Sequence, residues 1–595
     1  MPMHKYADND DDVVMPYTTC NIYPAMKDTE TTGTPATKAA AEASTTTKTT
    51  KKKKKHIFKK KIPQKGDPDY LSPTQLRNRR KRKAKKKAKV QAQPQQQQEE
   101  SSKEPTDSNN NNKSNEDEEL KDPSMKYITY PTKTPIVRTA KKYIEPLLQS
   151  SSNSNTNSNT NAFHVYIGPL YHWRTVSKLA VRPDSNNTNK VAIGLFAENS
   201  HSLLPVPKCK AHHPSINKVV EVVTNACHEL NVTPYESNTA DNESKSEAEM
   251  GQLRYIGVNI DRQSGGAQLT LVWNGTSGEE DEQLEKLVAA ILRKTVLCKS
   301  GEAGGEEPPM KRQRRRGRRG DNKESQEKDD VKKSNASNNE SNSKVSLHSL
   351  WINYNSSWKH SNRIFEYDAS CWRHVTGPTS ITEHLRFPTP KSEGQKGVAD
   401  PTPLNYPVPL HFPPTVFRQA NLDSFTNIVG RIRERVMKMD EKPFCVELYG
   451  GVGTIALNLS DAVSHIVSSD ENSNNLKCFQ DSVKQLPAEI QPLLEYKQKN
   501  AADMVTSEPD LFQKCELLVL DPPRKGLEDE VVDFLCKGEC SSIKLLVYVS
   551  CGFQAFQRDC DALLASGRWG LEFAEGHVLF PGSDAIETLA FFIPK

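Results

Sequence analysis

The sequence is poor in apolar residues for its length. Hydrophobic residues make up 35% of the 595 positions, and the mean hydropathy is −0.73. Ordinary globular domains contain roughly 45–50%. A chain with this composition throughout would bury too little apolar surface to offset the entropy lost on ordering. Because the apolar runs gather in the C-terminal third, we expect one large folded region with long disordered additions.

Three further features are missing, and each excludes a class of protein. No stretch approaches the roughly 18 consecutive apolar residues of a transmembrane helix, so we expect no membrane partner. The 12 cysteines form no CxxC pair, so the sequence predicts neither a zinc ribbon nor a disulfide framework, and we assign no metal ligands. The first residues are acidic, with Asp8 and Asp10–Asp12, which argues against a secretory signal or a typical transit peptide.

Positive charge, by contrast, is present in three dense runs: Lys51–Lys61, Arg77–Lys89 and Lys311–Arg319. The formal net charge is only +6, so the rest of the chain is acidic and the basic residues belong to arms outside the fold. Such arms suit RNA phosphates, because each neutralised phosphate releases counterions, and they also resemble nuclear import signals. The runs favour the nucleus or the cytoplasm, and solvated tails without a specific partner are the alternative.

Composition divides the chain into three regions. Residues 1–125 are rich in Thr, Lys, Gln and Asn and should be disordered. We interpret 162–410 as an α+β domain that carries a disordered insertion at 301–343. Its expected helices are Ser215–Leu230 and Gln283–Lys299. Its expected strands are Phe163–Ile167, Ser177–Arg182, Val191–Phe196, Gln268–Trp273, and a returning pair at Trp351–Tyr354 and Arg363–Tyr367.

Residues 411–595 alternate between helix and strand, which predicts an α/β domain with a mostly parallel, doubly wound, Rossmann-like sheet. The expected helices are Ser424–Met437, Thr454–Leu459 and Asn474–Gln485. The expected strands are Phe444–Leu448, Ile466–Ser469, Glu516–Leu520, Leu545–Val549 and Leu589–Ile593. Ligands of such sheets bind beyond the carboxyl ends of the strands, where polar residues follow the first four of these strands.

The first of those polar segments is a glycine loop, Glu447-Leu-Tyr-Gly-Gly-Val-Gly453. Glycines after a strand let a ligand approach the backbone, and we expect a helix N-terminus to follow. Asp470 ends the next strand, where a carboxylate can accept hydrogen bonds from both hydroxyls of a ribose. Because Ala456 replaces the third glycine of the dinucleotide fingerprint, both NAD and S-adenosylmethionine fit this motif.

Three more segments carry chemistry. Asp521-Pro-Pro-Arg-Lys-Gly526 follows a strand, and its prolines should form a rigid platform that holds Asp521 in place. Cys551 follows another strand, and Arg524 or a helix N-terminus could lower the pKa of its thiol and make it a nucleophile. Glu587 enters an apolar strand, where partial burial would raise its pKa and suit a general base. Taken singly, each of these segments also has an ordinary structural explanation.

Together, the order and spacing of these motifs resemble the RNA uracil-5-methyltransferase family, the S-adenosylmethionine-dependent enzymes that make 5-methyluridine in tRNA or rRNA. The matching segments are the glycine loop, Asp521–Gly526, Tyr548–Cys551, Ile586–Thr588 and Phe417-Arg-Gln419-Ala-Asn421. Upstream, Trp173–Ala180 and 194–217 resemble the family's RNA-contacting central domain. The chain departs from the family at Gly552-Phe553, where Asn-Pro often follows the cysteine, and at Asp584-Ala585, where a histidine is often found.

The resemblance implies a role for each site residue. Cys551 would be the nucleophile, Glu587 the general base, and Asp521 would bind the uracil edge or fix its own loop. The cofactor S-adenosylmethionine would be held by residues from several segments: Gln419, Tyr449, Gly451, Gly453, Asp470 and Asp521. Two alternatives stay open: a cytosine-5 RNA methyltransferase, and a non-catalytic RNA-binding protein with a degenerate methyltransferase fold.

Overall fold

The computed structural model describes residues 122, 124–151, 162–185, 187–197, 202–206, 208–235, 251–298, 344–356, 364–387, 404–538 and 541–595. All of them belong to one compact unit, Asn109–Lys595. The predicted disordered region 1–125, apart from its last few positions, and the insertion 301–343 lie outside these ranges. Within them, no helix combines the length and the apolar character needed to cross a membrane.

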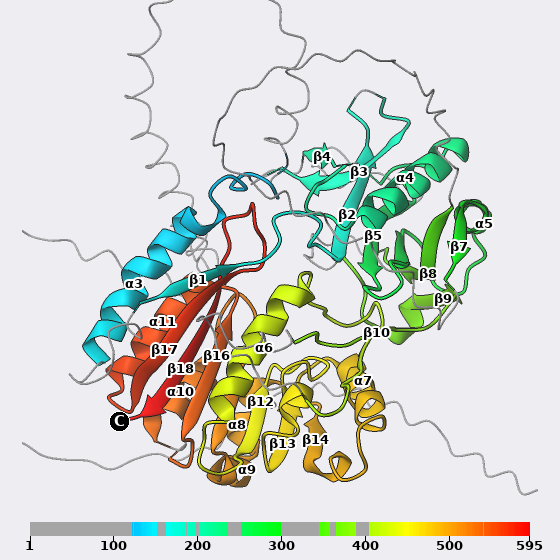
Figure 1. The fold of residues 1–595 in the computed structure, drawn as a ribbon. Coiled ribbons are helices and arrows are strands. Elements are labelled where there is room, and N and C mark those ends of the chain that lie inside the picture. Colours follow the sequence, from blue (N-terminus) through cyan, green and yellow to red (C-terminus); the bar gives the residue numbers. More distant parts are fainter. Residues whose placement is uncertain are drawn as a thin grey trace, which may run out of the picture. The chain divides into compact units, whose positions relative to one another are not determined.

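The C-terminal part contains a mixed sheet with the strand order β1-β17-β18-β16-β15-β12-β13-β14 (Figure 1). β12 to β16 run parallel to one another, and β18 is inserted antiparallel between β16 and β17. The mostly parallel strands, connected by helices, confirm the predicted α/β fold class. The strands are β1 (His164–Ile167), β12 (Phe444–Leu448), β13 (His465–Ser469), β14 (Leu494–Lys497), β15 (Leu517–Leu520), β16 (Leu545–Ser550), β17 (Trp569–Val578) and β18 (Glu587–Pro594).

Helices cover both faces of this sheet, which explains why its central strands are apolar without alternation. Val446, Leu518 and Leu546 point toward one set of helices, whereas Cys445, Leu517 and Val519 point toward the other set. The first set comprises α3 (Pro135–Ser151), α8 (Ala501–Ser507), α9 (Pro509–Lys514), α10 (Asp529–Lys537) and α11 (Phe553–Ala565). The second comprises α6 (Leu422–Val436), α7 (Ser473–Val483) and the 3-10 turn η5 (Ala456–Leu459). The pair β10 (Ile381–Glu383) and β11 (Leu410–Phe412) packs on the second face, and two further 3-10 turns are η1 (Pro131–Lys133) and η6 (Gln491–Leu493).

The central part forms a second sheet, in the order β4-β3-β2-β5-β6-β8-β7, with β9 paired to β8. α4 (Pro214–Glu229) and α5 (Glu282–Lys294) bury their apolar stripes against one face of it. The strands are β2 (Val176–Pro183), β3 (Val191–Phe196), β4 (Leu203–Pro205), β5 (Leu253–Ile260), β6 (Ala267–Trp273), β7 (Thr295–Leu297), β8 (Val345–Tyr354) and β9 (Trp372–Thr376), and η4 (Ala369–Cys371) precedes β9.

Three predicted elements differ from the structure. The helix expected to reach Lys299 ends at Lys294, because Thr295–Leu297 pairs with β8 as a short strand. The described part of the strand expected at 363–367 is irregular, because the side chain of Asn353 bonds both the N–H and the carbonyl of Glu366. β9 pairs with β8 in its place. After the glycine loop, only turns and η5 follow instead of an α-helix.

Two elements near the N-terminus join the C-terminal sheet rather than the central one. β1, which lies within the stretch predicted as the central domain, pairs in parallel with β17. α3, which the sequence analysis did not predict, packs its apolar residues Val137, Ala140 and Ile144 into the core of the C-terminal sheet. Residues before the central sheet therefore help to build the region that carries the candidate site.

Candidate active site

The candidate site lies at the carboxyl edge of the C-terminal sheet, where strand register brings separate motifs together. Leu448 pairs with both Ser469 and Leu520, so Tyr449, Asp470 and Asp521 follow at the same level. On the other side, Ser550 of β16 pairs with Thr588 of β18. Since β18 is antiparallel, its first residue, Glu587, stands beside Cys551, the residue that follows β16.

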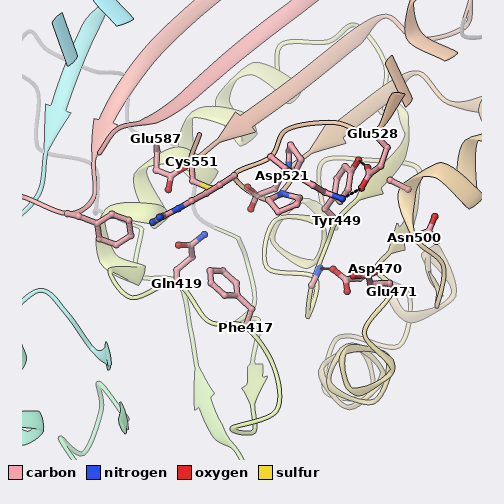
Figure 2. Close-up of a pocket in the computed structure, with 17 residues that line it drawn as sticks. Phe417, Gln419, Tyr449, Asp470, Glu471, Asn500, Asp521, Glu528, Cys551 and Glu587 are labelled. Atoms are coloured by element: carbon pink, nitrogen blue, oxygen red, sulfur yellow. Dashed lines mark hydrogen bonds and ion pairs between the residues drawn. The ribbon is translucent and has the colours of Figure 1, made fainter. Parts of the chain in front are cut away.

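A cavity of about 480 Å³ opens at this edge. Seven of the eight predicted site residues line it: Gln419, Tyr449, Gly451, Asp470, Asp521, Cys551 and Glu587. Figure 2 shows Cys551 and Glu587 close together at one end, Tyr449 and Asp470 toward the other, and Asp521 between them. The eighth residue, Gly453, is not among the residues that line the cavity. An added Cβ there would lie 2.5 Å from the ring of Phe479, so packing and a φ of +84° require this glycine.

The glycine loop is held open toward the cavity. Gly451 adopts a φ of +56°, and a Cβ on it would meet no atom within 4 Å, so its backbone faces free space. Its N–H donates to Asp470 Oδ2 at 3.2 Å, and its carbonyl accepts from the Tyr496 hydroxyl at 2.9 Å. Asp470 Oδ1 accepts from the Asn472 N–H and the Asn475 amide as well. The carboxylate of Asp470 is thereby fixed at the cavity wall.

A second tie joins the glycine loop to the Asp-Pro-Pro segment. Tyr449, with an unusual φ of +62°, donates its hydroxyl proton to the carboxylate of Glu528. Glu528 also pairs with Lys525 at 2.6 Å. Asp559 of α11 holds the same segment, because it accepts from the Leu527 N–H at 3.0 Å and from the Tyr548 hydroxyl at 2.7 Å. The sequence analysis missed Asn475, which bonds the nearby Asp470, and it missed Glu528, Asp559 and Tyr496, whose partners are distant in the sequence.

Burial controls the acid–base properties of the reactive end. It raises the pKa of Glu587 to about 8, and the charge of Asp521 adds to this, whereas Arg524 opposes it. Burial likewise raises the pKa of Asp521 to about 7. The pKa of the Cys551 thiol is raised to about 11 by burial and by the charges of Glu587 and Asp521, while Arg524 again lowers it. The site thus holds a thiol and two carboxyl groups whose pKa values are all raised by burial.

Gly552 is a position at which this sequence departs from the family that it resembles, and the structure gives this glycine a role in packing. A Cβ on it would lie 2.5 Å from the carbonyl oxygen of Arg524, so the Cys551 and Asp521 segments touch through this glycine. Both segments would have to separate to admit a side chain.

We therefore expect Gly552→Ala to lower methyl transfer at least about tenfold, because a displacement of about 1 Å at a reactive centre is costly. Gly570→Ala is the matched control, since the nearest atom to its Cβ is 3.4 Å away on the Lys595 side chain. Equal initial rates of methyl incorporation for the two variants would contradict this interpretation.

Two aromatic residues also line the cavity. Phe417 is 70% exposed, although it is a large apolar side chain. Phe580 packs against Trp173 of the central part, with ring centroids 5.3 Å apart, and Arg174 lies over both rings. Trp173–Ala180, which the sequence analysis matched to an RNA-contacting domain, therefore reaches the cavity through Phe580.

The cavity suits S-adenosylmethionine. Its volume lies within the roughly 300–1,000 Å³ of small-molecule sites. The open backbone of Gly451 and the fixed carboxylate of Asp470 offer contacts for the methionine and ribose parts, and Asn500 lies at the same end (Figure 2). These residues would bind the cofactor, with Cys551 and Glu587 facing the remaining space.

Comparison with known proteins finds that this chain is similar in sequence to RNA methyltransferases. No family model matches the chain. An uncharacterized RNA methyltransferase of Protochlamydia amoebophila is 28% identical over 427 residues, which cover 71% of this chain and 87% of that protein. An uncharacterized RNA methyltransferase of Bacillus cereus is 22% identical over 425 residues, or 71% of each. Among solved structures, the Pyrococcus abyssi tRNA (uracil-54, C5)-methyltransferase in complex with S-adenosyl-L-homocysteine aligns with a TM-score of 0.47 and 16% identity, covering 77% of this chain and 83% of that one. The two sequence relatives confirm the resemblance to RNA methyltransferases that the motifs indicated.

Proposed function

We propose that this protein is an S-adenosylmethionine-dependent RNA methyltransferase that methylates C5 of a uridine in tRNA or rRNA. The observation that carries the proposal is the pair of Cys551 and Glu587 at one buried end of the cavity, with Asp521 beside them and the glycine loop at the other end. A thiol and a carboxyl group in contact with one substrate ring suit covalent activation followed by proton removal.

The chemistry begins at C6 of the target uracil, because C5 alone is a poor nucleophile. The thiolate of Cys551 adds to C6 and forms a C–S bond, and the electrons of the C5–C6 double bond pass into an enolate. Arg524, which lines the cavity, is placed to support the enolate oxygen and to favour the thiolate. S-adenosylmethionine, when bound, supplies an electrophilic methyl group. The cavity walls would align this group with C5, which would bond to the methyl carbon as the bond from that carbon to the sulfonium sulfur breaks and S-adenosylhomocysteine is left. Such positioning accounts for much of the expected rate.

Two further steps release the product. The carboxylate of Glu587 removes the proton from C5, the C5–C6 double bond re-forms, and the C–S bond to Cys551 breaks. Burial suits Glu587 to this task, because its raised pKa, about 8, makes it a stronger base than an exposed glutamate. The target nucleotide must leave its base stack to reach this site, and Phe417 and Phe580 offer aromatic surfaces at the cavity for it.

A cytosine-5 enzyme would use the same covalent logic with a cysteine beside the proline of the Asp-Pro segment. Here Pro522 and Pro523 follow Asp521, and the thiol comes from the neighbouring strand instead. The non-catalytic alternative would leave the half-buried Cys551 and the buried Glu587 without a role. Uracil C5 is therefore the target that these residues favour.

The proposal is tested by incubating the full-length protein with methyl-labelled S-adenosylmethionine and pools of unmodified tRNA and rRNA transcripts. The RNA is then digested and its nucleosides are separated. We expect the label in 5-methyluridine. Label in 5-methylcytidine would favour the cytosine enzyme, and cofactor binding without any labelled nucleoside would favour the RNA-binding protein.

A further inference from the structure

The loop that precedes Glu587 is contacted by a segment from the N-terminal side of the described chain, in which the sequence analysis found no motif. This loop, residues 579–586, connects β17 to β18 and ends directly before the proposed base. At its start, the Asn421 amide donates to the Leu579 carbonyl at 2.7 Å. Its middle and end are held by residues of the N-terminal side of the described chain.

The first contact lies at Gly582. The Tyr127 N–H donates to the Gly582 carbonyl at 2.8 Å. Gly582 has a φ of +98°, and a Cβ on it would lie 2.2 Å from the carbonyl oxygen of Ser124. Both the conformation and the close approach of the Ser124–Tyr127 backbone therefore require glycine at this position.

The second contact lies at Asp584, three residues before Glu587. Its Oδ1 accepts a hydrogen bond of 2.9 Å from the Ile136 N–H, in the first turn of α3. Thr134 and Pro135 complete this helix start, because Thr134 accepts from the Val137 N–H and Pro135 has no N–H to satisfy. An anionic carboxylate at a helix N-terminus is also favoured by the helix dipole. Asp584 is thus the cap that ties the loop to α3.

The same helix also contacts α11, the element that follows Cys551. Tyr143 of α3 donates its hydroxyl proton to Asp561 Oδ1 of α11 at 2.6 Å. Its ring lies edge-on to Phe553, with centroids 6.1 Å apart. Phe553 is the first residue of α11 and comes two positions after Cys551. One helix therefore contacts the element after the proposed nucleophile and the loop before the proposed base.

From these contacts we infer that residues 124–151 are a positioning element of the active site, which we call the N-terminal brace. The brace holds the 579–586 loop against α11 and so sets the placement of Glu587 relative to Cys551. Asp584 is its main positioning residue, since it is the side chain that links the brace to the loop. This inference rests on the proposed function for its catalytic consequence, but not for the contact itself.

The test compares three variants of the full-length chain. Asp584→Ala removes the acceptor, whereas Asp584→Asn keeps an oxygen that can accept from Ile136. Thr139→Ala is the matched control, because Thr139 is exposed on α3 and, within the described ranges, its hydroxyl donates to the Pro135 carbonyl of its own helix. Since Asp584 is itself exposed, we expect all three variants to fold.

Two readouts are needed. Amide hydrogen exchange in peptides that cover residues 583–588 requires no RNA and reports on the loop. Steady-state kinetics and the amount of covalent protein–RNA adduct report on the base. For Asp584→Ala we expect faster amide exchange in the loop and a larger amount of covalent adduct. We expect kcat to fall about fivefold, as the loss of one helix cap implies, and KM to stay unchanged. Asp584→Asn should return all of these toward the wild type.

The inference would be overturned if amide exchange in the loop of Asp584→Ala were as slow as in the wild type. It would also be overturned if exchange were faster but the kcat of Asp584→Ala equalled that of Thr139→Ala. Failure of the proposed function is recognised separately, because the wild type would then form no 5-methyluridine while the exchange readout still showed whether the brace holds the loop.

Discussion

Cys551→Ala is expected to abolish methyl transfer while cofactor binding persists. The thiol lies at the opposite end of the cavity from Asp470 (Figure 2), to which the Gly451 N–H donates, so its removal leaves the proposed cofactor contacts in place. Without the thiolate, C5 of uracil gains no nucleophilic character. The loss should reach at least about a thousandfold, as is usual when an enzyme loses its nucleophile. Methyl incorporation into RNA and calorimetric binding of S-adenosylhomocysteine measure the two properties.

Cys371→Ala serves as the cysteine control, because Cys371 is half-buried in the central part and is not among the residues that line the cavity. It should retain full activity. Turnover by Cys551→Ala above about one-hundredth of the wild-type rate would sink the nucleophile assignment, because removing a true nucleophile costs far more. Loss of cofactor affinity in the same variant would show that the two ends of the cavity are not independent.

Glu587→Gln is expected to stall the reaction after methyl transfer, so that the covalent adduct accumulates. The substitution preserves the size of the side chain at a position that is 4% exposed, but it removes the group that takes the C5 proton. Cys551 cannot leave until that proton is lost. A denaturing gel should show a protein–RNA band in this variant that the wild type shows only weakly.

Glu572→Gln is the matched control, since Glu572 lies on the neighbouring strand β17 and pairs with Arg435 away from the cavity. It should behave like the wild type. Normal turnover by Glu587→Gln, without a retained adduct, would mean that another group is the base, and Asp521 would be the next to replace.

The same carboxyl group sets an expected pH dependence. A base must be deprotonated to act, and burial raises the pKa of Glu587 to about 8. Turnover by the wild type should therefore rise from pH 6 to pH 9, with about a tenfold change per pH unit below the pKa. In the residual activity of Glu587→Gln the rise should be less steep, because only the Cys551 thiol, whose pKa is raised to about 11, still has to lose its proton. A wild-type profile that is flat over this range would contradict the assignment.

The strands of the C-terminal sheet could be predicted well, because local sequence patterns indicate where each of them begins and ends. β12, β13, β15 and β16 are short apolar runs that each end in a polar or glycine residue, and parallel strands bring those ends to one edge. Cys551 follows one of these strands, whereas Glu587 begins β18, and the sequence analysis linked the two through the resemblance to a family. Their adjacency required one further fact, the antiparallel insertion of β18, which no local pattern shows.

What the sequence did not predict depends on contacts between distant positions. Asp559 and Glu528 are ordinary acidic residues of amphipathic helices until Tyr548 and Tyr449 are folded against them. Asp584 could be noted only as a departure from the resembling family. In the structure it caps α3 by accepting from Ile136, which lies 448 positions earlier in the chain. The residue that caps a helix N-terminus usually stands directly before that helix in the sequence, so sequence spacing gives no sign of this cap.

Covalent trapping tests the central claim most directly. The full-length protein is mixed with S-adenosylmethionine and tRNA or rRNA transcripts that carry 5-fluorouridine, in which fluorine replaces the proton that Glu587 must remove. After denaturation and digestion, mass spectrometry locates the modified peptide. The account predicts a methylated 5-fluorouridine joined to Cys551, and no such species from Cys551→Ala. A nucleotide attached to another residue, or no adduct with either RNA pool despite measurable cofactor binding, would contradict it.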